Sequence, residues 1–111
     1  RELMRNIKAK QNIALMVDQK VTQGLISNFF NRKALTISLP AQMALKYDYI
    51  LQPITIKRVG SINFEITIND EIKINDQDDE VSITQKINHQ LEKMILDNPD
   101  QWIWTHDRWR I

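Results

Sequence analysis

Apolar residues near the C-terminal end of the chain repeat at the spacing of an α-helix. Between Ser82 and Asp97 they form one stripe, which consists of Ile83, Ile87, Leu91, Met94 and Ile95. Ser82 and Gln85 have the spacing of a capping box, and the Asn98-Pro99 pair stops the helix. An amphipathic helix of this length must bury its apolar stripe, so the chain requires a second layer of secondary structure.

That second layer is predicted to contain β-strands. Residues 61–68 alternate apolar and polar side chains, as in a half-buried strand, and Gly60 favours a turn back to a strand over 50–59. The continuous apolar run 12–18 predicts a strand buried on both faces, as in a parallel sheet. With a helix over 36–47 between the first two strands, a right-handed βαβ crossover is expected. The fold class is therefore α/β, with a mixed sheet and flanking helices.

Three further segments complete the predicted order. Residues 1–10 form an amphipathic helical pattern, residues 18–33 lack a clean period and are interpreted as a long loop, and residues 75–80 form an acidic loop. Thr36 or Ser38 can cap the helix over 36–47. Long loops in small domains often carry function, which directs attention to residues 18–33.

Length and composition exclude several classes of protein. The 111 residues allow one domain at most, and because the chain starts with Arg we expect further sequence upstream and interpret 1–111 as a single partial domain. Cysteine is absent, which excludes disulfides, thiolate metal sites and cysteine nucleophiles. No apolar run approaches the roughly 20 residues that span a bilayer.

Charge is distributed unevenly along the sequence. Residues 1–58 hold ten Lys/Arg and three Asp/Glu (+7), whereas residues 59–111 hold five and eleven (−6). A basic half favours anionic partners such as phosphates or lipid headgroups, but lysines that only keep a surface soluble explain the same count.

Two candidate binding pairs lie in or next to the predicted loop. Asp18 and Gln19 end the first predicted strand, where open α/β sheets bind ligands, and the cations Arg32 and Lys33 follow in the loop. An Asp at the end of a strand is also a common turn former, so both interpretations stay open.

The two histidines do not suggest a metal site. His89 is expected to be solvated or to cap, and His106, between aromatic residues and arginines, is expected to be structural. Too few ligands occur at regular spacing for zinc, the acidic loop lacks the pattern of a calcium site, and no Gly-rich phosphate loop exists. No metal and no cofactor are predicted.

All three tryptophans lie near the C-terminal end. Trp102 and Trp104 are expected to pack against the rest of the fold, and Trp109 belongs to the same structural tail. The alternative is a stacking surface for nucleic acid or a membrane-interface belt, with Arg108 and Arg110 left open as binding residues.

Several motifs, in their order along the chain, resemble those of a known protein family. The motifs are "LMVDQK", "FFNRKALT", "PAQMALKYDYILQPITIKRV", "FEITI" and "ITQKINHQLEKMILDNPDQWIWTHDRW". Together they are similar to the C-terminal half of the bacterial lipid A biosynthesis acyltransferases, the lauroyl and myristoyl transferases. The resemblance implies the C-terminal part of a glycerolipid-acyltransferase-like α/β sandwich.

The resemblance also implies an activity. Such enzymes work at the cytoplasmic face of the inner membrane of Gram-negative bacteria and move a fatty acyl chain from acyl carrier protein to a hydroxyl of a lipid A precursor. A His-x-x-x-x-Asp/Glu motif supplies their general base. Neither histidine here fits, because Met94 follows His89 by five positions and Ile111 follows His106 by five. No catalytic residue is therefore assigned, and the catalytic half and an N-terminal membrane helix are expected upstream.

Matched residue by residue, Asp18 and Gln19 correspond to the family's Asp-Gln pair near the acceptor phosphate. Arg32 lies in a Phe-Phe-Gly-Arg stretch in which Asn31 replaces the usual glycine, and Asn tolerates positive φ. The tentative substrate-binding set is Asp18, Gln19, Arg32, Lys33 and Arg108, and the structural tail is Trp102, Trp104, His106 and Trp109. A non-enzymatic, split-gene remnant that binds lipid or a partner chain remains the alternative, and no nucleic-acid partner is expected.

Overall fold

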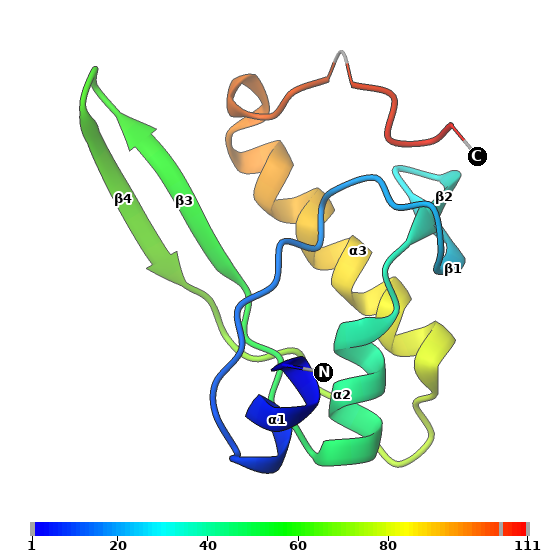
Figure 1. Ribbon diagram of the computed structural model, residues 1–111. Helices are drawn as coiled ribbons and strands as arrows, with labels where there is room; N and C mark the ends of the chain where they lie inside the picture. Colours follow the sequence, from blue (N-terminus) through cyan, green and yellow to red (C-terminus); the bar gives the residue numbers. More distant parts are fainter. Residues whose placement is uncertain (1, 105, 111) are drawn as a thin grey trace.

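Helix α3 (Glu80–Asp97) lies at the centre of the molecule and contacts α2, β1 and η1 (Figure 1). The computed structural model describes residues 2–104 and 106–110. The other elements, in chain order, are α1 (Glu2–Lys8), β1 (Leu25–Phe29), β2 (Arg32–Thr36), α2 (Leu39–Tyr47), β3 (Ile54–Val59), β4 (Asn63–Ile68) and η1 (Pro99–Gln101). The predicted α/β class is confirmed.

Strands β1 and β2 form an antiparallel hairpin in the segment that we expected to be a loop. Phe29 pairs with Arg32, and the two residues between them, Phe30 and Asn31, have positive φ values of 52° and 61°. Two successive residues of this kind make a tight turn that matches the twist of the strands. The expected loop over 18–33 is therefore wrong from Leu25 onward, although Asn31 does adopt the predicted positive φ.

The predicted strand over 12–18 is also wrong. This segment contains no strand, because no other described segment pairs with it, and a strand exists only through its hydrogen-bonded neighbour. Both sheets in the described residues are antiparallel hairpins, β1–β2 and β3–β4. The expected βαβ crossover is consequently absent from residues 2–104 and 106–110.

Strands β3 and β4 confirm the two predicted strands in shortened form. They pair from Ile54 with Ile68 to Val59 with Asn63, and Gly60 has a φ of 74° in the turn, as predicted. The expectation of a half-buried strand is wrong, because every residue of β4 is exposed. The hairpin extends away from the helices instead of lying against them (Figure 1).

The predicted helices are confirmed, but their caps differ from prediction. Asp79, not Ser82, is the N-cap of α3: its carboxylate accepts from the Ser82 amide, and the Ser82 hydroxyl accepts from the Asp79 amide. Ser38 occupies the N-cap position of α2 but makes no side-chain cap hydrogen bond. Gln85, which was predicted to complete a capping box, takes no part in the cap of α3.

Two apolar clusters flank α3 and share Leu91. One consists of Phe29, Ala34 and Ile95, with Phe30, Leu91, Trp102 and Trp109 packed against it. The other consists of Ala41, Ile83 and Ile87, with Val17, Leu51, Ile72 and Leu91 packed against it. The predicted stripe of α3 therefore supplies the core, as the helical spacing required.

Candidate functional site

The C-terminal tail folds onto the β1–β2 hairpin and forms an aromatic cluster with it. Trp109 is stacked on Phe29 with ring centroids 5.6 Å apart, and Trp102 meets Phe29 edge-on at 5.6 Å. The ring centroid of Trp104 lies 4.7 Å from that of Trp102 and 5.6 Å from that of Phe30. We define the aromatic cluster as Phe29, Phe30, Trp102, Trp104 and Trp109. Aromatic pairs in such arrangements stabilise a fold by more than the burial of their apolar area alone.

The tryptophans of this cluster differ in exposure. Trp109 is partly buried and donates its indole Nε1–H to the Phe29 carbonyl at 2.7 Å. Trp104 donates to the Pro99 carbonyl, but 45% of its surface remains exposed. His106, expected to belong to the structural tail, is exposed. The tail thus presents a packed side with Trp102 and Trp109 and an exposed side with Trp104 and His106.

Arg108 belongs to the same tail, but its side chain is buried, with only 2% of its surface exposed. Its guanidinium donates to the Leu35 carbonyl at 2.7 Å and to the Thr36 hydroxyl at 3.3 Å, and it lies 5.5 Å from the ring centroid of Phe29. Burial lowers the pKa of Arg108, and the negative charge of Asp18 acts in the opposite direction. In this conformation Arg108 is a positioning residue rather than an exposed anion ligand.

A buried polar cluster surrounds Arg108, and we define it as Thr36, Asn88 and Arg108. Asn88 is fully buried and donates to the Thr36 hydroxyl at 3.1 Å. The Asn88 Oδ1 and Arg108 Nε atoms find no hydrogen-bond partner among the described residues. Sequence reasoning considered Thr36 only as a possible helix cap and missed Asn88, because neither the end of a strand nor the face of a helix signals which partner a polar residue will meet.

Asp18 and Gln19 differ in their environment. Asp18 is partly buried, and its negative charge acts to raise the pKa of Arg108, although no hydrogen bond or ion pair joins these two described residues. Gln19 is exposed, and its Nε2 donates to the Met16 sulfur at 3.9 Å. Of the predicted pair, only Asp18 influences another candidate residue, through its charge.

Arg32 and Lys33 are separated by the alternation of strand β2. Arg32 pairs with Phe29 on the face that carries the aromatic cluster, and its guanidinium lies 5.5 Å from the ring centroid of Trp109. Lys33 pairs with Asn28 on the opposite face. The structure therefore places Arg32 and Arg108 against rings of the aromatic cluster, and Lys33 on the other face of the hairpin.

Gln85 joins α3 to the same hairpin. Its side chain accepts from the Ser27 hydroxyl at 2.8 Å and from the Asn28 amide at 2.9 Å, and it donates to the Asn28 carbonyl at 3.0 Å. The Gln85 side chain thus supplies the hydrogen-bond partners that a neighbouring strand would otherwise give to the backbone amide and carbonyl at the edge of β1. The hairpin that carries Arg32 is consequently fixed from both α3 and the tail.

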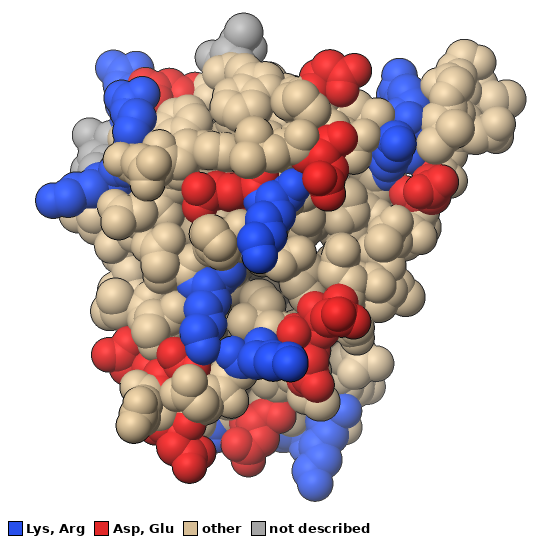
Figure 2. Space-filling model, turned by 180° about the vertical axis from the view of Figure 1, so that it is seen from behind, with Lys and Arg blue, Asp and Glu red and all other residues tan. Residues whose placement is uncertain are grey.

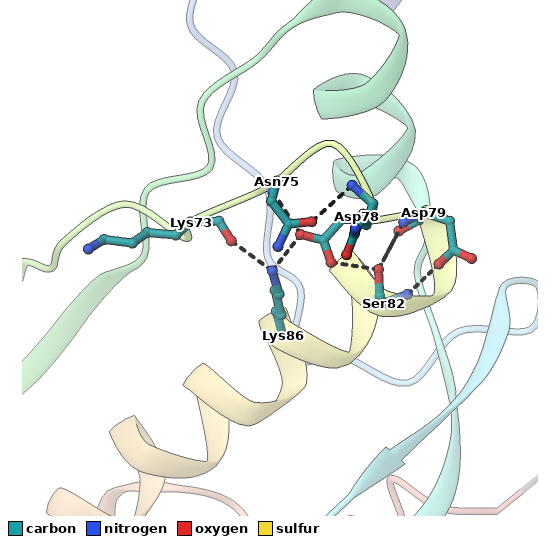
Figure 3. A network of polar contacts seen from close by, with 7 residues as sticks. Lys73, Asn75, Asp78, Asp79, Ser82 and Lys86 are labelled. Atoms are coloured by element: carbon teal, nitrogen blue, oxygen red, sulfur yellow. Dashed lines mark hydrogen bonds and ion pairs between the residues drawn. The ribbon is translucent and has the colours of Figure 1, made fainter.

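A second polar network lies at the start of α3 (Figure 3). Lys86 binds the Asp78 carboxylate and the Lys73 carbonyl, while the Ser82 hydroxyl donates to Asp78 at 2.8 Å. The hydrogen bond from Lys86 above all, together with those from the Asn75 amide and the Ser82 hydroxyl, lowers the pKa of Asp78 to about 2. The network attaches the preceding loop to the helix.

Both histidines are exposed. His89 is exposed, with Nδ1 3.8 Å from a Glu92 oxygen, and it lines a shallow groove with Glu71, Lys73, Lys86 and Gln90. Within residues 2–104 and 106–110, no group of three His, Cys, Asp or Glu side chains could hold a metal ion.

Figure 2 shows the face turned away from the view of Figure 1. Cationic and acidic side chains are interspersed on it, so the uneven charge along the sequence does not produce a surface of one sign there.

No helix in the described part of the chain has the length and apolar character needed to cross a bilayer. A comparison with curated proteins gives no match. The family model described as bacterial lipid A biosynthesis acyltransferase matches residues 1–111, which is the whole chain. The resemblance found in the sequence is thereby confirmed, and the chain belongs to the bacterial lipid A biosynthesis acyltransferase family.

Proposed function

We propose that this chain is the acceptor-binding and scaffolding part of an O-acyltransferase that moves a fatty acyl group from acyl carrier protein to a hydroxyl of a lipid A precursor. The observation that carries the proposal is the family match over residues 1–111. The reaction takes place at the cytoplasmic face of the inner membrane of a Gram-negative bacterium, and the 111 residues are a single partial domain of the enzyme.

The chemistry requires a general base. The base removes the proton from the acceptor hydroxyl, the oxygen attacks the thioester carbonyl, and the thiolate of the carrier leaves and takes up a proton. His89 and His106 lack a carboxylate five positions later, and His89 is solvent-exposed. We therefore assign the base to a segment upstream of residue 1.

The contribution of this chain is to hold the acceptor. Arg32 is exposed beside Trp109, which leaves its guanidinium available to an anionic group of the lipid precursor. We assign Asp18 and Gln19 polar contacts with the precursor because they match the family's Asp-Gln pair, and Lys33 adds positive charge from the other face of the hairpin. Arg108 supports the site from beneath, because it holds the Leu35 carbonyl and the Thr36 hydroxyl.

The test is an acyl-transfer assay with acyl carrier protein thioester and a lipid A precursor. It compares this chain with the polypeptide that includes the upstream reading frame. We expect transfer only by the longer polypeptide. In that polypeptide Arg32→Gln should raise KM for the acceptor, whereas Lys46→Gln, which changes an exposed cation in the last turn of α2, should leave KM unchanged.

A non-enzymatic remnant that binds lipid or a partner chain is the second candidate. A remnant predicts no transfer by either polypeptide and a stop codon or degenerate sequence upstream. Transfer by the 111-residue chain alone would contradict both candidates, since it would require a base that we have not identified.

A further inference from the structure

The β3–β4 hairpin is attached to the rest of the molecule at two places. At its base, Leu51 and Ile72 pack against the apolar cluster that contains Ile83, and the Ile72 amide donates to the Leu51 carbonyl at 2.8 Å. The second attachment lies near the tip, at Arg58, one residue before the end of β3. The hairpin is thus held at both ends, by apolar packing at the base and by polar contacts near the tip.

The attachment near the tip consists of a single side chain. The Arg58 amide donates to Gln101 Oε1 at 2.8 Å, and Gln101 Nε2 donates to the Arg58 carbonyl at 3.1 Å. Both backbone groups of Arg58 therefore point away from β4, because such groups alternate between the two edges of an antiparallel strand. In the part of the chain that the structure describes, no other hydrogen bond or ion pair joins β3 or β4 to a helix or to the β1–β2 hairpin.

The surface between the two attachments contributes little apolar packing. Thr55 and Lys57 are the partly buried residues of β3, so their polar face is the one turned towards the rest of the fold. The apolar side chains lie on the opposite face, where Ile54 and Ile56 remain 53% and 63% exposed. A polar face gains little from burial, so the two hydrogen bonds of Gln101 have a large share in fixing the orientation of the hairpin.

Gln101 also connects this hairpin to the aromatic cluster. It ends η1, and the next residue, Trp102, meets the Phe29 ring edge-on with centroids 5.6 Å apart. Trp102 packs against the apolar cluster that contains Phe29 and Ile95. Because Gln101 and Trp102 are joined by a planar peptide bond, the position of Trp102 determines where the side chain that reaches Arg58 begins.

We propose that Gln101 is a latch. Bound to Arg58, it fixes the β3–β4 hairpin in one orientation, and its release lets the hairpin pivot about its base. Because Trp102 places the latch, a change in the aromatic cluster is transmitted to the β3–β4 hairpin, and the reverse also holds. The latch therefore couples two hairpins that share no strand. This device goes beyond the proposed function, and its test involves no acyl transfer.

The test measures the orientation of the hairpin in the 111-residue chain by residual dipolar couplings of its backbone amides. One alignment should account for α3, β3 and β4 in the unmodified chain. Gln101→Leu keeps a side chain of similar size but removes both hydrogen bonds, so the couplings of β3 and β4 should shrink while those of α3 stay unchanged. Gln77→Leu, the same change at an exposed glutamine in the loop before α3, is the control and should leave all couplings unchanged.

Hydrogen exchange distinguishes release of the latch from a general loss of stability. In Gln101→Leu the Arg58 amide should exchange about tenfold faster, because it loses its acceptor. The Lys57 amide, which alternation directs to β4, should change less. A chain that is only destabilised would accelerate both amides by the same factor.

A second variant tests the transmission. Trp102→Leu leaves Gln101 and Arg58 unaltered, yet it should also raise the exchange rate of the Arg58 amide relative to that of Lys57. An unchanged ratio in this variant would overturn the coupling between the hairpins. Dipolar couplings of β3 and β4 that Gln101→Leu leaves unchanged, or equal acceleration at Arg58 and Lys57, would overturn the latch itself. Both measurements are independent of enzymatic activity, so their failure is distinguishable from failure of the proposed function.

Discussion

Trp109 holds Phe29 in two ways at once: its ring stacks on the Phe29 ring, and its Nε1–H donates to the Phe29 carbonyl at 2.7 Å. The contact joins residues 80 positions apart and fixes the end of β1 next to the turn of the hairpin. Since Arg32 pairs with Phe29 across that hairpin, the tail determines where the candidate binding cation lies.

The two parts of this contact can be separated. Trp109→Phe keeps a ring on Phe29 but removes the donor, and should lower the free energy of unfolding by about 1 kcal/mol. Trp109→Ala removes the ring as well and should cost about 3 kcal/mol. Urea unfolding measures both. Trp104→Ala is the matched comparison: because Trp104 is 45% exposed, its loss should cost less than that of Trp109, and an equal cost would contradict the packing described here.

Arg108 should be intolerant of lysine. Arg108→Lys loses the fork that reaches both the Leu35 carbonyl and the Thr36 hydroxyl, and it buries a more strongly hydrated charge. The expected loss in the free energy of unfolding is about 2 to 3 kcal/mol. Arg110→Lys, at an exposed position two residues later, should change it by no more than about 0.5 kcal/mol. Similar values for the two variants would contradict a supporting function for Arg108.

Gln85 should contribute more than an ordinary surface glutamine. Gln85→Ala removes three hydrogen bonds to β1 and leaves the buried Ser27 hydroxyl without its acceptor, which should cost about 2 kcal/mol. Gln90→Ala on the same helix is the control. Hydrogen exchange should also accelerate at the amide of Asn28 in the Gln85 variant, and unchanged protection there would show that the side chain is not the partner.

The Asp78 network predicts how stability depends on pH. The folded-state pKa of Asp78 is about 2, below its ordinary value of 3.8, so the unfolded chain binds the proton more tightly. The stabilisation is therefore complete above about pH 4 and is lost as the pH falls towards 2.

Asp78→Asn removes this contribution. The difference in unfolding free energy between the unmodified chain and the variant should be constant from neutral pH down to about pH 4, and should then shrink towards pH 2. Asp76→Asn, an exposed position in the same loop, is the control. A difference that persists unchanged at pH 2 would mean that ionisation of Asp78 does not carry the effect.

Elements with a clear period were predictable from sequence. The spacing of Ile83, Ile87 and Ile95 specified α3, and the alternation of residues 61–68 specified β4, because each period follows from local backbone geometry. The β1–β2 hairpin was missed, since its turn at Phe30-Asn31 lies between two strands whose apolar and polar residues show no clean alternation. Asn31 was the available signal, as a residue that accepts positive φ.

The candidate site also has features that could be predicted from sequence and features that could not. The sequence by itself determined the amphipathic helix, the two strands around Gly60, the family and the set of candidate residues, because these depend on side-chain identity and spacing along the chain. Only the tertiary structure decided that Arg108 is buried against Thr36, that Arg32 and Lys33 lie on opposite faces, and that residues 12–17 form no strand. These outcomes depend on which distant segment supplies a hydrogen-bond partner or an apolar cover, and that information is absent from local sequence.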